Sequence, residues 1–267
     1  MFTGPSTTRR ARSGDGLRRS IRLFRAFLTE QTDPVGFYTL IAEDAVTLLA
    51  RHTSLEGKRV VDFGGGPGFY SEAFARHGAL SVVVDADHTE ITSHRRHPLS
   101  VQALAEASPV ADGSMDIVFS SNLLEHVPDV AVVADRMAAA ARPGGLVVLS
   151  YTAWLGPWGG HETSPWHYLG GHRAARRYER KHGRPPKNVF GESMYAASVA
   201  EGMRWASGAS GLELLEARPR YLPPWSRVLV RIPVLREFLT WNLWLVLRRV
   251  DDNDRDTVRT RSGPFDQ

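Results

Sequence analysis

A glycine-rich turn between an apolar run and an amphipathic run constrains this chain more than any other feature. The stretch RVVDFGGGPGFYSEAFARHG (Arg59 to Gly78) places four glycines and a proline in the five successive positions 64–68. Each glycine adds to the entropy cost of folding, and a tight turn usually needs only one of them. We therefore expect a loop whose bare backbone admits a ligand at close range.

Segments typical of strands and helices alternate on both sides of this loop. Four short apolar runs predict buried strands, at residues 59–63, 80–87, 115–122 and 146–154. Two amphipathic runs predict helices, at residues 69–78 and 129–142, and glycines follow or end both of them. This alternation predicts the α/β class, with a Rossmann-like, doubly wound and mostly parallel sheet covered by helices on both faces.

The flanks of this core differ from it in pattern. Regular structure is predicted there as helices at 23–52 and 194–211 and as strands at 212–222 and 241–249. Residues 154–192 have no clean period and contain many glycines and prolines. They predict a long insertion after the fifth strand, with a basic helix near 173–181.

One folded unit accounts for the length of 267 residues. We expect it to span residues 20–250, and its parts are a core at 55–153, the insertion at about 154–192, and C-terminal strands with a hydrophobic segment at 210–250. Residues 1–19 are predicted to be a disordered basic leader, and residues 251–267 a disordered tail.

The positive charge of the chain is concentrated at its beginning. The net charge is +4, but residues 1–25 carry seven arginines and one aspartate, or +6, which leaves −2 for the rest. We therefore expect no nucleic-acid partner. The leader fits either a solvated arm or a tether to anionic lipid headgroups. Its arginines interrupt any signal-peptide core, and the chain has no cysteine, so we expect a cytoplasmic protein.

The glycine loop does not match two familiar ligand-binding patterns. A P-loop needs a lysine, and this loop has none. The dinucleotide pattern Gly-x-Gly-x-x-Gly fails because Phe69 or Ser71 falls at its last position. The pattern that fits is acid-x-Gly-x-Gly-x-Gly, formed by Asp62, Gly64, Gly66 and Gly68.

This pattern resembles motif I of the class I S-adenosylmethionine-dependent methyltransferases, of the type 11 kind. The resemblance extends from about Val60 to Tyr151. The acid Asp85 in VVVDAD, the stretch SPVADGSMDIVFSSNLLEHV and the turn ARPGGLVVLS are similar to later motifs of the family, in the same order. The resemblance implies S-adenosylmethionine as the cofactor and methyl transfer as the activity.

The resemblance also implies a donor site at the ends of the strands. Glycines admit the amino-acid end of the donor, and Asp85 accepts hydrogen bonds from its ribose hydroxyls. Leu104 stands where many relatives have an aspartate, so adenine recognition falls to nearby backbone. The implied donor contacts are Asp62, Gly64, Gly66, Gly68, Asp85, Ala86, Ala105, Glu106 and Ser120. From the residues alone, Asp62 also fits a structural turn and Asp85 a helix N-cap.

Two histidines are the predicted catalytic residues. An oxygen or nitrogen acceptor needs a base, and His126 in LLEHV and His161 in GGHETSPWHYLGG suit neutral pH. His126 fits a hydrogen-bonded histidine at a helix entry equally well. The tryptophan-rich loop around His161 predicts a lid over an apolar acceptor, with a satellite hydrophobic cluster as the alternative. We expect no metal, because His161, His167 and His172 show neither a helical pair nor a thiolate partner.

The segment from Pro223 to Arg249 is rich in Trp, Leu and Val, with arginines between them. It fits either an amphipathic helix packed on the sheet before the last strand or a surface that meets lipid. Peripheral contact with the inner membrane face is therefore one expectation, and the oligomeric state stays open.

These features together predict a methyltransferase that acts on a small, hydrophobic or envelope-related acceptor. One alternative is a nicotinamide-dependent oxidoreductase, which would share Asp85 but lacks the last glycine of its fingerprint. The other is a non-catalytic protein that retains the fold.

Overall fold

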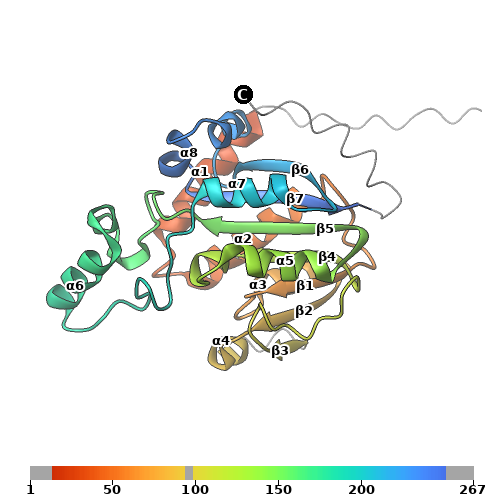
Figure 1. The fold of residues 1–267 in the computed structure, drawn as a ribbon, viewed down its shortest axis with the longest axis horizontal. Coiled ribbons are helices and arrows are strands. Elements are labelled where there is room, and N and C mark those ends of the chain that lie inside the picture. The colour runs from red at the N-terminus through yellow and green to blue at the C-terminus, as the bar shows by residue number, and fades with distance from the viewer. Residues whose placement is uncertain (1–13, 94–98, 251–267) are drawn as a thin grey trace, which may run out of the picture.

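The computed structural model describes residues 14–93 and 99–250, which form a seven-stranded sheet with helices on both faces (Figure 1). The strands are β1 (Arg59–Phe63), β2 (Leu80–Asp85), β3 (Ser100–Gln102), β4 (Met115–Ser121), β5 (Ala141–Thr152), β6 (Leu212–Pro219) and β7 (Asn242–Arg249). The expected disorder of residues 1–13 and of the tail 251–267 concerns segments outside the described residues.

The sheet has the predicted doubly wound topology. Its strand order is β3-β2-β1-β4-β5-β7-β6. Strands β1 to β5 pair in parallel, whereas β7 runs antiparallel to both β5 and β6. The chain winds outward from β1 on one side and from β4 on the other. In such sheets the crevice at the carboxyl ends of these two strands is the ordinary place for a ligand.

The helices occupy most of the predicted positions. They are α1 (Gly14–Leu28), α2 (Pro34–Leu49), α3 (Phe69–Arg76), α4 (His88–Ser93), α5 (Val130–Ala140), α6 (Gly171–His182), α7 (Val199–Gly208) and α8 (Leu235–Leu239). Four 3-10 helices join them: η1 (Leu124–His126), η2 (His161–Thr163), η3 (Trp166–Leu169) and η4 (Pro224–Arg231). The insertion after β5 therefore contains η2, η3 and the basic helix α6.

Alternating side chains of the central strands supply two separate cores. Val118 and Val147 join the core that packs against α5 and α7. Their neighbours Phe119 and Val148 join the core against α2 and α3, where Trp244 is the largest fully buried side chain. Because both faces are covered, these strands are apolar at successive positions.

The segment 23–52, which is predicted to be helical, is divided between two helices. α1 ends at Leu28 and α2 begins at Pro34. Asp33 caps α2, since its Oδ1 accepts a hydrogen bond of 2.9 Å from Gly36 N. An aspartate followed by proline is a strong helix start, and proline disfavours helical backbone at the preceding residue.

The predicted disorder of residues 14–19 is also corrected, because these residues begin α1. Leu23 is buried against the body, and Arg19 pairs with Asp44 of α2. Arg19 Nη2 also donates to the carbonyl of Arg220 at 3.0 Å. Only the tertiary contacts reveal that residues 14–19 belong to a helix, because the arginines of this segment are typical of a solvated arm.

No sequence pattern predicts β3, which is three residues long and exposed along its whole length. Within the described ranges, no helix is both long enough and apolar enough to cross a membrane.

We predict that Arg19→Met lowers the free energy of unfolding by about 3 kcal/mol, because it leaves the buried Asp44 carboxylate without its partner. Urea unfolding of the full chain measures this change. The exposed Arg18→Met variant is the control and should unfold like the parent. Equal stability of both variants would contradict the anchoring of α1.

Candidate active site

The glycine loop after β1 lies at the carboxyl edge of the sheet and is open on one side. Gly64, Gly66 and Gly68 adopt positive φ values of 68°, 48° and 86°, which side chains rarely tolerate. A Cβ at Gly64 would lie 2.9 Å from Leu123 Cβ, whereas a Cβ at Gly66 would meet nothing nearer than 3.9 Å. The space beside Gly66 is therefore available to a ligand and is bordered by Asp85.

Two aspartates, Asp62 and Asp85, contact the backbone of this loop. Asp62 is buried, and burial, followed by the nearby charge of Asp85, raises its pKa well above the ordinary value. Its Oδ2 accepts from Ser71 Oγ at 3.5 Å, while its Oδ1 is buried without a hydrogen-bond partner among the described residues. Asp85 Oδ2 accepts from Gly66 N at 2.8 Å, and Asp85 Oδ1 accepts from Asp87 N at 2.8 Å.

The other predicted donor contacts lie along the same edge of the sheet. Ala86 follows β2, and its carbonyl accepts from Gln102 Nε2 of β3 at 3.1 Å. Ala105 is buried just beyond β3, and Glu106 beside it is exposed. Ser120 pairs with Phe63 near the end of β4, and its Oγ is buried without a partner in the described structure.

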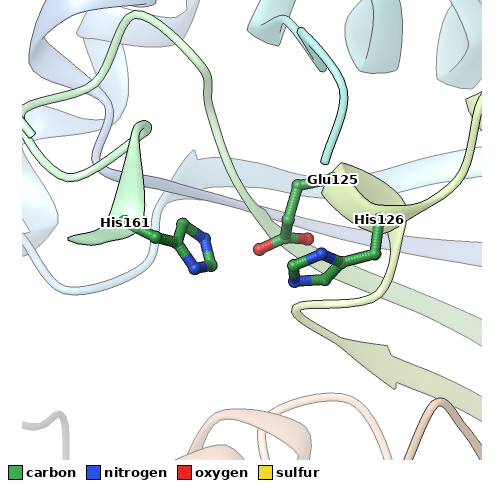
Figure 2. A group of neighbouring side chains, drawn as sticks. All are labelled: Glu125, His126 and His161. Carbon is green, nitrogen blue, oxygen red and sulfur yellow. The ribbon is translucent and has the colours of Figure 1, made fainter. Parts of the chain in front are cut away.

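The structure brings together the two predicted catalytic histidines, although 35 positions separate them. The rings of His126 and His161 lie 5.3 Å apart between centroids and are nearly perpendicular. The carboxylate of Glu125 points into the same space, as Figure 2 shows. One ligand atom from each of the three side chains lies within 4.8 Å of the others, so this is a group that could hold a metal ion.

Hydrogen bonds define the tautomers of the two histidines. His126 Nδ1 lies 2.7 Å from the carbonyl of Ser193 and must donate to it, which leaves a lone pair on Nε2. His161 Nδ1 lies 3.4 Å from Asn188 Nδ2, and both carboxylate oxygens of Glu162 identify that nitrogen as a donor. The proton of neutral His161 is therefore on Nε2. This assignment favours proton transfer and hydrogen bonding over metal ligation by His161 Nε2.

Burial controls the charges in the cluster formed by Glu125, His126 and His161. It lowers the pKa of His161 to about 4, and the neighbouring His126 and His167 add to this effect. Burial raises the pKa of Glu125, although the charge of His126 opposes the shift. Glu125 Oε1 accepts from Thr152 N at 3.0 Å, while Oε2 is buried without a partner in the described part of the chain. His161 also has a φ of 46°, an uncommon conformation that often marks functional sites.

Glu125 is the residue that the sequence reasoning missed. It stands next to His126 in LLEHV, but a glutamate at that position gives no sign of being buried. Its burial depends on η1, a single 3-10 turn after β4 that directs Glu125 inward against β5.

The remaining aromatic residues of the insertion have different roles. His167 is buried against Trp154, and His172 packs on Phe190, so neither joins His161 in a metal-binding trio. Trp158 stacks on Trp241 at 5.3 Å and contacts α1, so it anchors the insertion to the body. Trp166 is partly exposed beneath the guanidinium of Arg177, at 3.8 Å.

A depression of about 600 Å³ lies within the insertion after β5. Apolar Trp154, Leu169 and Phe190 line it, together with the basic residues Arg173 and Arg176. A short stretch of chain separates it from the histidines: Asn188 contacts His161, Phe190 lines the depression, and Ser193 contacts His126.

The fold defines a class of protein, the α/β proteins with a doubly wound sheet and, here, a glycine loop at its switch point. Residues 61–149 match the family model described as a methyltransferase domain. A relative named as an uncharacterized methyltransferase, from Mycobacterium marinum (strain ATCC BAA-535 / M), is 48% identical over 242 residues, which cover 86% of this chain and 94% of the relative. One from Mycolicibacterium gilvum (strain PYR-GCK) is 47% identical over 243 residues, which cover 87% and 94%.

The solved structures agree on the fold. The crystal structure of an S-adenosylmethionine-dependent methyltransferase from Mesorhizobium loti has a TM-score of 0.54 at 20% identity, and the match covers 76% of this chain and 96% of that one. The chain therefore belongs to the class I S-adenosylmethionine-dependent methyltransferase family, and S-adenosylmethionine is its cofactor. The predicted family and cofactor are confirmed, and the nicotinamide alternative is not favoured.

We predict that Gly66→Val and Asp85→Ala each weaken binding of S-adenosylhomocysteine. The valine would fill the open space at an unfavourable φ, and loss of the carboxylate would cost on the order of 1–3 kcal/mol for unpaired hydroxyls. Calorimetric titration measures the affinity. Gly113→Val is the matched control, since Gly113 has a φ of 65° in open space away from the loop. Parent-like affinity in both site variants would refute the donor site.

The lowered pKa of His161 predicts a pH-dependent stability. The unfolded chain, with an ordinary histidine pKa near 6.5, binds more protons than the folded chain between about pH 6.5 and 4. The free energy of unfolding should therefore fall as the pH falls through this window. His161→Gln should reduce that slope, and the exposed His182→Gln should keep it. Urea unfolding at several pH values measures both, and parent-like slopes in His161→Gln would contradict the burial effect.

Proposed function

We propose that this methyltransferase modifies an oxygen or nitrogen atom of a small, hydrophobic or envelope-related acceptor, and that Glu125, His126 and His161 surround the reacting atom. The proximity of this cluster to the glycine loop supports the proposal most. Gly64 lies directly against Leu123, and η1 with Glu125 and His126 begins one residue later. The donor and proton-accepting groups therefore meet at the carboxyl end of β4.

The residues of the glycine loop fit the donor. The open space beside Gly66 suits the amino-acid end, and Asp85 keeps lone pairs for the ribose hydroxyls beyond those used by Gly66 N and Asp87 N. Asp62 supports the loop from beneath, with one oxygen still unpartnered in the described residues. Ala86, Ala105, Glu106 and Ser120 complete the proposed contacts. When bound, S-adenosylmethionine supplies an electrophilic methyl group on a sulfonium.

His126 acts as the proton acceptor in this proposal. Its Nε2 lone pair would take the proton that the acceptor oxygen or nitrogen loses when it receives the methyl group. The neighbouring carboxylate of Glu125 stabilises the imidazolium. Neutral His161 donates through Nε2–H and orients the acceptor, and its low pKa keeps a second positive charge away from the sulfonium. No metal is needed for these roles.

The depression in the insertion supports the proposed class of acceptor. Its apolar side chains suit an alkyl or aromatic body, and Arg173 and Arg176 suit an anionic group. Helix α6, which carries both arginines, lies away from the sheet in Figure 1. The position is consistent with the predicted lid over the acceptor, which stays a proposal.

The test is turnover with a panel of aromatic and long-chain carboxylic acids, phenols and amines, with mass spectrometry to detect the gain of one CH2 group. We predict that His126→Gln lowers kcat by about 10²–10⁴-fold and leaves S-adenosylhomocysteine affinity unchanged, because the base acts only in the chemical step. His182→Gln is the control, and EDTA should leave the parent active. Full turnover by His126→Gln would refute its role, and loss of turnover in EDTA would point to a metal at the cluster.

A further inference from the structure

We propose that this protein docks reversibly on an anionic lipid bilayer through one face, built from α1, the segment 224–239 and η3. This segment contains η4 and α8, and the face is called the docking face below. The docking itself is independent of the chemistry proposed above. The inference that the acceptor comes from the bilayer rests on that proposed function.

Helix α1 has a second apolar stripe, which the fold does not bury. Leu23 and Arg19 face the body, where Leu23 is buried and Arg19 pairs with Asp44. A second stripe, with the helical spacing of i, i+4, i+7 and i+11, is exposed to solvent and consists of Leu17, Ile21, Phe24 and Leu28. A helix that needed only to pack on α2 would carry polar residues there.

The segment 224–239 extends this exposed apolar surface. Trp225 is 76% exposed and Val234 is 68% exposed, which is unusual for side chains of this size. Leu235 and Leu239 of α8 are also exposed. Val234 has a φ of 66°, which is a strained conformation for a β-branched residue. This strained conformation exposes the apolar side chain of Val234 to solvent, so it contributes nothing to the core. It therefore favours a role for Val234 in contact with lipid.

The parts of the docking face adjoin one another. The start of α1 touches the start of η4, since Gly16 packs directly against Pro224. The ring of Phe24 lies 5.6 Å from that of Trp241, which follows α8. Tyr168 of η3 stacks on Phe238 of α8 at 6.3 Å. Figure 1 shows α1 and α8 together at one end of the molecule.

The charge of the face complements anionic headgroups. Arg18, Arg22 and Arg25 are exposed between the apolar positions of α1, and Arg231 is exposed on η4. The acidic residue of α8, Glu237, is turned inward, where its carboxylate accepts from two backbone amides at the start of α7. Exposed Trp and Leu with interspersed arginines are typical of helices that lie in a membrane interface.

The docking face borders the acceptor depression. Leu169 is 62% exposed beside Tyr168 and also lines the depression, so one residue belongs to both surfaces. Arg173 and Arg176 also line the depression. An amphiphile that leaves the bilayer at η3 would place its apolar part against Trp154 and Phe190 and its anionic group near these arginines. The geometry therefore favours a membrane lipid with an acidic headgroup as the acceptor.

Vesicle co-sedimentation of the full chain tests the docking. Parent protein should bind phosphatidylglycerol-containing vesicles at low salt, bind pure phosphatidylcholine vesicles much less, and lose binding at high salt. Leu28→Ser/Trp225→Ser and Arg18→Glu/Arg22→Glu should each reduce binding by roughly tenfold or more.

Matched variants keep the result specific. Leu80→Ser/Val132→Ser removes two apolar side chains that are also more than half exposed but lie elsewhere, and Arg184→Glu/Arg204→Glu makes the same change of charge elsewhere. Both should bind vesicles like the parent. Calorimetric titration with S-adenosylhomocysteine should give parent-like affinity for all four variants, which separates docking from the donor site and from misfolding.

Three outcomes would overturn the proposal. The first is a parent that ignores anionic vesicles at low salt. The second is equal loss of binding in the docking-face variants and their matched controls. The third is a concentration-dependent dimer in sedimentation velocity that the docking-face variants abolish, because the face would then pair with a second copy. Docking without turnover of any acidic lipid would support the docking and reject the bilayer as the source of the acceptor.

Discussion

The close contact between the Asp62 carboxyl and the backbone of Gly65 is the constraint on which the proposed donor site depends. A Cβ at Gly65 would lie 2.6 Å from Asp62 Oδ2, so only glycine lets the loop fold back over this side chain. The fold of the loop then brings Gly66 N to Asp85 at the end of β2. Two carboxyls from neighbouring strands thus position one loop, and the space left beside Gly66 follows from that arrangement.

A buried arginine connects this donor edge to the other half of the sheet. Arg220 is fully buried beyond β6 and donates to Ser121 at the end of β4 and to Tyr70 of α3. Its backbone carbonyl accepts from Arg19, which pairs with Asp44. Helix α1, which carries one part of the proposed docking face, is therefore connected through polar contacts to the end of β4, which precedes Glu125 and His126.

The insertion after β5 contacts the proposed catalytic cluster and also contributes to the proposed docking face. It supplies His161 to the cluster, packs Trp158 against Trp241 and α1, and exposes Leu169 beside the acceptor depression. Because the same segment contacts the cluster and borders the docking face, an acceptor bound at the surface would need to move only along this segment. Its length, with no strand of its own, is typical of loops that carry function.

The sequence by itself determined the parallel core, the glycine loop and the family, because strand periodicity and close backbone approach leave local signals in residue type. Asp62, Gly64, Gly66, Gly68 and Asp85 were readable for that reason. Only the tertiary structure decided that His126 and His161 meet, that Glu125 joins them, and that α1 is ordered from Gly14. These outcomes depend on contacts between segments far apart in the chain, such as Arg19 with Asp44, which no local pattern encodes.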